Sequence, residues 1–169
     1  MSRKSPLAQR GWTLMEVTAV LLLLGIVSAV ILYQAGDTGV AKVAGQTEAL
    51  KSQLRYAQSR AMNSNVRYGL HFDTSGGITT YNLYRVNTSV PGNEEALAMA
   101  GQDVSITLPG GVYVSSPSGE FYVSFDDWGA PYQGHNPASP LSSTLTLTVS
   151  GPDADSRTIT IHPRTGFIP

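Results

Sequence analysis

The sequence predicts an α+β protein in which a long N-terminal helix precedes a mainly antiparallel β domain. No charged residue occurs from Val17 through Gly36. Apolar side chains between residues 43 and 61 then recur at helical spacing. After residue 65, short alternating runs are separated by turns rich in glycine and proline. The predicted parts are a leader peptide at 1–11, a transmembrane helix at 12–36, an amphipathic second half of the helix at 37–64 and a β domain at 65–169.

Length and composition narrow the possible functions. A chain of 169 residues suits one anchor and one domain. It has no cysteine, which excludes disulfides, thiolate metal sites and a cysteine nucleophile. Without the three basic residues of 1–11, eight basic side chains face twelve acidic ones, a net side-chain charge of −4. This charge argues against nucleic acid as the main partner.

The uncharged N-terminal segment is nearly long enough to cross a bilayer. As a helix, residues 17–33 cover roughly 25 Å, close to the ~30 Å hydrocarbon thickness. Extending the helix back to Trp12 completes the span but places Glu16 inside it. A carboxylate in that position costs about 2.5–3.5 kcal/mol. We therefore expect Glu16 to meet a counter-charge.

Two common kinds of N-terminal segment fit this stretch only in part. A secretory signal peptide would explain the basic residues Arg3, Lys4 and Arg10. However, the apolar core is long for such a signal, contains Glu16 and lacks a clear small-residue cleavage site. A simple single-span anchor explains the length but gives no reason for Glu16 or Gly11.

The run Gly11-Trp12-Thr13-Leu14-Met15-Glu16-Val17 resembles the prepilin signal of type IV pilins and type II secretion pseudopilins. The resemblance implies that a prepilin peptidase cleaves between Gly11 and Trp12 and methylates the new amine of Trp12. It also implies that Glu16 pairs with that amine on a neighbouring subunit during filament assembly. The alternative for Glu16 is a side chain that extends toward the headgroups. Trp12 departs from the phenylalanine that is usual in the family.

The second half of the helix has one regular apolar face, and the pattern predicts that it packs on the β domain. Asn63-Ser64-Asn65 is expected to end the helix, which would run from about residue 12 to residue 62. Gly36, Gly39 and Gly45 loosen the pattern between the two halves. The residues of the apolar face are Val43, Leu50, Leu54, Ala57 and Ala61.

Period-two alternation predicts the strands of the β domain. The first is expected at 66–73, and it forms a hairpin with 78–86 across Thr74-Ser75-Gly76-Gly77. Residues 87–103 and 126–143 are expected to be long loops. The remaining strands are expected at 104–108, 112–115, 121–125, 145–149 and 157–162.

Three later segments look like parts of the H-type minor pseudopilins of type II secretion systems and their pilus-side relatives. They are the helix end at 50–62, the run Phe125-Asp126-Asp127-Trp128-Gly129-Ala130-Pro131, and the ending at 159–168. The resemblance implies a low-abundance subunit near the tip of a short periplasmic filament. The presence of Glu16 argues against the extreme tip subunit, which lacks this acid in the family pattern.

The sequence offers no catalytic residues, no cofactor site and no metal site that we would assign. His71, His135 and His162 each stand alone. Asp126 and Asp127 resemble part of a calcium-binding loop of major pseudopilins, but a solvated acidic turn is the preferred explanation. Asp126 and Glu120 could be imagined as a carboxylate pair, but any chain with twelve acidic residues offers such pairs. Trp128, placed among loop residues, is a candidate for an exposed partner contact.

We expect a non-enzymatic minor pseudopilin that helps initiate or cap the pseudopilus of a type II secretion system. Its expected partners are other pseudopilins or pilins, prepilin peptidase and the inner membrane, with the N-terminus cytoplasmic and the β domain periplasmic. One alternative is a minor pilin of a type IV pilus, including the mannose-sensitive haemagglutinin type. Another is a signal-anchored periplasmic binding protein or enzyme.

Overall fold

The computed structural model describes residues 13–35, 38–86, 94–98, 101, 103–134, 138–152 and 155–169. The chain divides into two compact units, residues 1–38 and residues 39–169, and each is described by itself. The second unit, a helix followed by antiparallel sheets, confirms the predicted α+β class.

The first unit contains helix α1, Leu14–Ala35. Its described side chains, through Val30, are all exposed within the chain. Among the described residues, no helix combines the length and the apolar character that crossing a membrane requires. The predicted transmembrane helix at 12–36 is therefore not confirmed.

Helix α2, Thr38–Ser64, opens the second unit. All five residues of the predicted apolar face are fully buried, which confirms the helical period. The helix ends at Ser64, within the predicted stop, because Asn65 takes a left-handed φ of 53° that ends helical hydrogen bonding. The single helix predicted from residue 12 to residue 62 is instead assigned as two, and residues 36–37 between them lie outside the description.

The larger sheet is built on the predicted hairpin. Strand β1, Tyr68–Asp73, pairs antiparallel with β2, Thr80–Val86, and the register joins Asp73 to Thr80. A short 3-10 turn, Ser75–Gly77, connects them. On its other side β1 pairs antiparallel with β6, Glu120–Phe125. The hairpin and the β6 strand were both predicted, and the structure confirms them.

Both predicted long loops contain short strands, so the prediction was wrong there. The full order of the sheet is β3-β2-β1-β6-β7-β8, with β4 paired to β2. The strands inside the predicted loops, β3, β7 and β8, are only two to four residues long, and period-two patterns need more residues than that to be recognised. The bounds of the short strands are Glu94–Leu97 for β3, Ile106–Thr107 for β4, Pro131–Gln133 for β7 and Ser139–Pro140 for β8.

The smaller sheet has three described strands in the order β10-β9-β5. Leu145, Leu147 and Val149 of β9 point into the core, as the alternation with threonine predicted. The strands β4 and β5 follow each other along the chain but lie in different sheets. β4 pairs with β2 in the larger sheet, and β5 pairs with β9 in the smaller one. The bounds are Tyr113–Ser116 for β5, Leu145–Ser150 for β9 and Ser156–Ile161 for β10.

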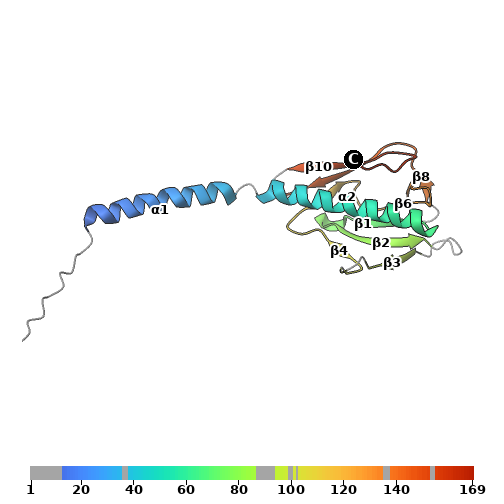
Figure 1. Ribbon diagram of the computed structural model, residues 1–169, viewed down its shortest axis with the longest axis horizontal. Helices are drawn as coiled ribbons and strands as arrows, with labels where there is room; N and C mark the ends of the chain where they lie inside the picture. The colour runs from blue at the N-terminus through green and yellow to red at the C-terminus, as the bar shows by residue number, and fades with distance from the viewer. Residues whose placement is uncertain are drawn as a thin grey trace, which may run out of the picture. The chain divides into compact units, whose positions relative to one another are not determined.

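One hydrophobic core joins α2 to both sheets. In Figure 1, α2 runs along the β domain with β10 on one side of it and β1 and β2 on the other. Phe72 stacks on Phe121 with ring centroids 4.7 Å apart and also contacts Tyr81. Aromatic rings from the larger sheet therefore pack together in the core. The buried face of α2 therefore holds the two sheets around a common interior.

Replacing Leu50 with alanine should lower the free energy of unfolding by about 2–5 kcal/mol, because the removed side chain leaves a cavity in this core. Ser52 lies two residues further along the same helix and is exposed. Ser52→Ala should therefore change the free energy of unfolding by less than about 0.5 kcal/mol. Denaturant unfolding of the purified full chain measures both. Equal effects of the two substitutions would show that this face of α2 does not carry the core.

Candidate functional site

The start of α1 is fixed by Thr13. The backbone N–H of Glu16 donates to the hydroxyl oxygen of Thr13 at 3.2 Å and to its carbonyl oxygen at 3.0 Å. A threonine that accepts from the third helical residue, here a glutamate, has the spacing of a helix capping box. Glu16 therefore has a local role in beginning the helix in addition to the assembly role that the prepilin resemblance implies.

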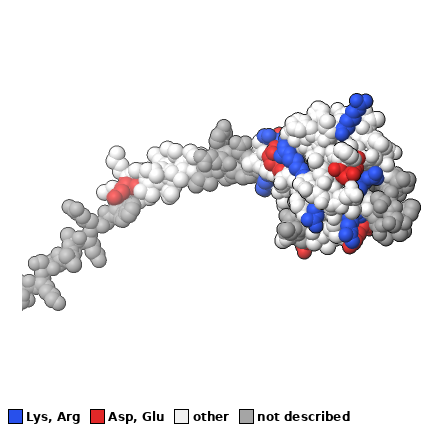
Figure 2. All heavy atoms as spheres, turned by 45° about the vertical axis from the view of Figure 1, so that its right-hand side comes forward, with Lys and Arg blue, Asp and Glu red and all other residues white. Residues whose placement is uncertain are grey.

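Glu16 is the only charged residue between Leu14 and Val30. Figure 2 shows the described part of α1 as an uncharged surface with one acidic patch. Within the described part of the chain, no Lys or Arg lies at ion-pair distance from this carboxylate. The predicted cleavage and methylation site, Gly11 and Trp12, lies outside the described residues.

The predicted contact residue Trp128 lies on a tight turn after β6. The carboxylate oxygen Oδ1 of Asp126 accepts hydrogen bonds from the backbone N–H groups of Trp128 at 3.0 Å and Ala130 at 2.8 Å. The N–H of Gly129 donates to the carbonyl of Asp126, and Gly129 takes a left-handed φ of 77°. The side chain of Trp128 is 84% exposed. This turn thus presents a large aromatic side chain to solvent on a closely hydrogen-bonded backbone.

Two polar side chains of α2 brace this turn and the end of the chain. The amide of Gln58 donates to the carbonyl oxygen of Gly129 at 2.9 Å and to that of Thr165 at 3.1 Å. The guanidinium of Arg55 donates to the carbonyl of Ile168 through both Nε and Nη2. Gln58 therefore ties two distant segments to one helix.

Gly166 allows these segments to approach each other. A Cβ at this position would collide with the carbonyl oxygen of Gly129 and with the amide of Gln58. Its φ of 62° is also unfavourable for any residue with a side chain. The three segments that carry the H-type resemblance, 50–62, 125–131 and 159–168, thus meet at one point, which we call the Gln58 junction (Gln58, Gly129, Thr165 and Gly166).

Asp126 and Asp127 differ in their surroundings. Oδ1 of Asp126 is already engaged by two backbone N–H groups, whereas Asp127 is exposed. Asp126 and Glu120, which nothing in the sequence favours as a pair, lie about 20 Å apart, because six residues of extended chain separate them. In the described part of the chain, no three His, Asp or Glu side chains gather as a metal site.

The two described histidines, His71 and His162, have different surroundings. His71 stacks on Tyr122, with ring centroids 4.2 Å apart, and shares a hydrogen bond with Asn82. His162 is exposed and faces Phe167 at 5.9 Å, while His135 lies outside the described residues. The alternation along β1 predicted that His71 lies on the polar face of its strand. Its partners Asn82 and Tyr122 come from the two neighbouring strands, so only the strand register could identify them.

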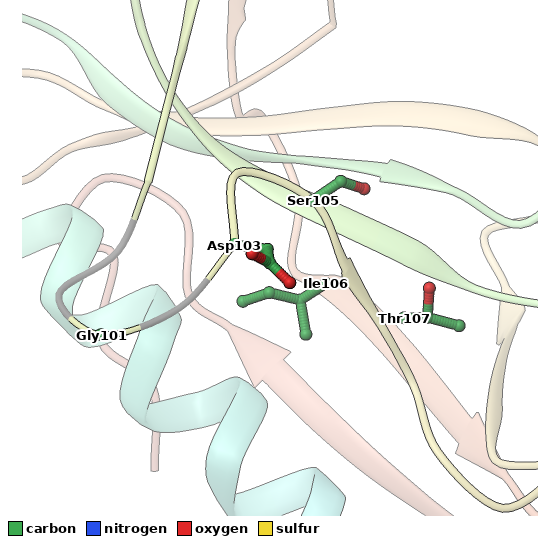
Figure 3. Close-up of a pocket in the computed structure, with 5 residues that line it drawn as sticks. All are labelled: Gly101, Asp103, Ser105, Ile106 and Thr107. Atoms are coloured by element: carbon green, nitrogen blue, oxygen red, sulfur yellow. The ribbon is translucent and has the colours of Figure 1, made fainter.

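A hollow of about 660 Å³ lies beside β4 and is lined by Gly101, Asp103, Ser105, Ile106 and Thr107. Figure 3 shows the side chain of Ser105 pointing away from those of Asp103 and Ile106. The described lining residues thus offer one carboxylate and two hydroxyl groups and include no histidine or lysine. We assign no catalytic role to this hollow.

The sequence did not predict the Gln58 junction. Gln58 lies on a helix surface, where glutamine is common, and its two acceptors are 71 and 107 residues away. The only available signal was the presence of Gly129 and Gly166 within the two resembling segments, because glycine there permits positive φ. Which side chain filled the space between them depended on the tertiary fold.

The fold and the Gln58 junction place the chain in the class of proteins with an N-terminal helix packed on antiparallel sheets. The chain belongs to the family described as type II transport protein GspH, whose model matches residues 46–166. It is thus a type II secretion pseudopilin of the GspH type, in a structural family and not an enzyme family, and membership implies association with other pseudopilins. No curated protein and no solved structure matches the chain.

Replacing Asp126 with alanine should lower the free energy of unfolding by about 1–3 kcal/mol, because two backbone donors lose a charged acceptor. The adjacent Asp127→Ala is the matched control and should change it by less than about 0.5 kcal/mol. Denaturant unfolding with and without added Ca²⁺ makes the measurement. If Ca²⁺ stabilised the parent chain but not Asp127→Ala, the two carboxylates would share an ion after all.

Proposed function

We propose that this pseudopilin is a minor subunit that helps to initiate or cap the pseudopilus of a type II secretion system. Family membership over residues 46–166 is the observation that carries the proposal. It favours the secretion system over the alternative type IV pilus. A structural role also agrees with a β domain whose most prominent exposed group is an aromatic side chain on a braced turn.

The N-terminal part of the proposal rests on the sequence. We propose cleavage between Gly11 and Trp12, methylation of Trp12, and anchoring in the inner membrane through residues 12–36. The uncharged run from Val17 through Gly36 and the order of residues 11–17 support it. The helix cap at Thr13 supports it further, because α1 begins at Leu14, two residues after the proposed new N-terminus.

Glu16 is proposed to pair with the amine of Trp12 on a neighbouring subunit. A carboxylate among apolar side chains is costly when alone and tolerated when paired, so the pairing sets register more than it adds stability. Among the described residues, no Lys or Arg lies at ion-pair distance from Glu16, which agrees with this pairing.

Glu16→Gln should lower incorporation into the pseudopilus several-fold. Glutamine keeps the spacing of the capping box but removes the charge, so the helix start should persist while the ion pair is lost. Cross-linking within isolated filaments measures incorporation, and mass spectrometry of the mature N-terminus should find methylated Trp12 in both proteins. Thr13→Val is the matched control, because it removes the cap hydroxyl and leaves the charge in place.

Normal incorporation of Glu16→Gln would remove the pairing from the proposal. A mature chain that retains its leader, or that begins well after Trp12, would contradict the processing step and favour the alternative of a signal-anchored periplasmic protein. Equal loss of incorporation in Thr13→Val would assign the effect to the helix start and not to the charge.

Trp128 is proposed to contact another subunit of the filament. Trp128→Ala should change the free energy of unfolding by less than about 0.5 kcal/mol, because the side chain is exposed, yet it should reduce secretion. Ile78→Ala removes another exposed apolar side chain and should leave secretion unchanged. Loss of stability in Trp128→Ala would show that the indole supports the fold, and unchanged secretion would exclude the contact.

A further inference from the structure

The smaller sheet ends on one side in strand β10, which pairs with β9 alone among the described strands. Residues 156–161 oppose residues 150–145 without a register shift. The N–H of Gly151 donates to the carbonyl of Asp155, and hydrogen-bonded pairs in an antiparallel ladder recur at every second residue. Residues 157, 159 and 161 therefore direct their backbone groups toward β9. The alternate residues Ser156, Thr158 and Thr160 direct theirs away from the sheet.

The outer edge of β10 is occupied only at its end. Among the described residues, no hydrogen bond uses the outward N–H or carbonyl of Ser156, Thr158 or Thr160. The next outward residue, His162, donates its N–H to the carbonyl of Phe167 at 3.0 Å. A partner backbone thus has three N–H donors and three carbonyl acceptors to meet along this edge.

The other described edge strands are protected against pairing. Strands β4 and β8 have two residues each, and β8 contains Pro140. Strand β3 has four residues, two of which are glutamates. In β5 the register shifts between Val114 and Ser116, and the N–H of Val114 already donates to the hydroxyl of Thr79 at 2.8 Å. Short length, charge, proline and bulges all prevent edge-to-edge pairing, whereas β10 is regular over six residues and has no proline.

The side chains of β10 hold it in the extended form that an added strand requires. Ile159 and Ile161 are fully buried in the core, which fixes the register of the strand. On the other face, Thr158 and Thr160 lie opposite the threonines of β9. Threonine and isoleucine are branched at Cβ and favour strands, so the edge has its binding conformation before a partner arrives.

The charge along this edge is positive. Arg157 is the one charged residue of β10, its side chain is exposed, and no ion pair joins it to a described acidic residue. Asp155 precedes the strand, but its Oδ2 atom is buried. From Ser156 through Pro169 the sequence contains no acidic residue, and Arg164 adds a second positive charge. An incoming strand that carries a carboxylate is therefore favoured over a basic one.

We propose that β10 binds an extended segment of a partner protein by strand addition, with an aspartate or glutamate of the partner opposite Arg157. Main-chain hydrogen bonds supply affinity in this mode, and side chains at alternate positions supply specificity. Because Arg157 directs its backbone groups toward β9, it takes a non-hydrogen-bonded position in the new pair, where opposing side chains lie closer. A second copy of β10 fits less well, because antiparallel pairing would place two Arg157 side chains on one face.

An NMR titration of the full chain with the peptide acetyl-Thr-Val-Thr-Glu-Thr-amide tests the proposal. Paired antiparallel to residues 156–160, this peptide places its glutamate opposite Arg157. We expect saturable shifts of the Ser156, Thr158 and Thr160 amide signals at millimolar peptide. The amide of Leu70, in the middle of the other sheet, should stay unchanged as an internal reference. The same peptide methylated on its backbone nitrogens keeps every side chain but cannot donate, so it should give no saturable shift.

Arg157→Gln should weaken peptide binding about three- to fivefold, as expected for the loss of one exposed ion pair. A peptide with glutamine in place of glutamate should lose the same factor with the parent chain and lose nothing further with Arg157→Gln. Arg164→Gln is the matched control, because it removes the same charge from the turn after the strand. It should bind as the parent chain does.

Thr158→Pro should abolish peptide binding, because it removes the central outward N–H of the edge. Proline is tolerated at such a position, since this N–H has no partner within the described chain. An unchanged Leu70 signal would show that the domain remains folded. The methylated peptide makes the same test from the other side of the pair, and it needs no variant of the protein.

Several results would overturn the proposal: no saturable shift with the parent chain, equal shifts with the methylated peptide, or equal weakening in Arg164→Gln. Tighter binding by Arg157→Gln would also overturn it and would show that the arginine protects the edge from pairing. A concentration-dependent dimer that Thr158→Pro abolishes would assign the edge to a second copy instead. The titration requires no filament and does not involve Trp128, so its failure would leave the proposed role in the pseudopilus untouched.

Discussion

The buried face of α2 is the constraint on which the β domain depends. Val43, Leu50, Leu54, Ala57 and Ala61 meet the inner faces of both sheets in one core. Each sheet has one apolar face, and neither could bury that face alone. Leu50 and Leu54 contribute large side chains to this core, whereas Ala57 and Ala61, toward the end of the helix, contribute small ones.

The same helix also organises the surface through its polar side chains. Gln58 and Arg55 bond to carbonyl groups far along the chain, so the turn at 126–130 and the C-terminal segment are both attached to α2. Carbonyl groups in such segments need partners when they are partly buried. The result is a rigid support beneath Trp128, which reduces the entropy that an exposed aromatic contact would lose on binding.

The two faces of the larger sheet differ in composition. The inner face is apolar and stabilises the domain, whereas the outer face collects tyrosine, histidine and glutamate side chains around a hollow. Because strand residues alternate between faces, a chain can vary the outer set without changing the core.

The amino-acid sequence by itself determined the regular parts of this protein. Helical spacing identified the buried residues of α2, and period-two alternation identified β1, β2, β6, β9 and β10, because each periodicity reports directly which side of an element is buried. The order of residues 11–17 and three short segments were enough to indicate the family. Only the tertiary structure decided the short strands β3, β7 and β8, the Gln58 junction and the outer-face hollow. Their stabilising contacts join residues distant in the chain, and no local pattern of side chains records which distant backbone group a polar residue will meet.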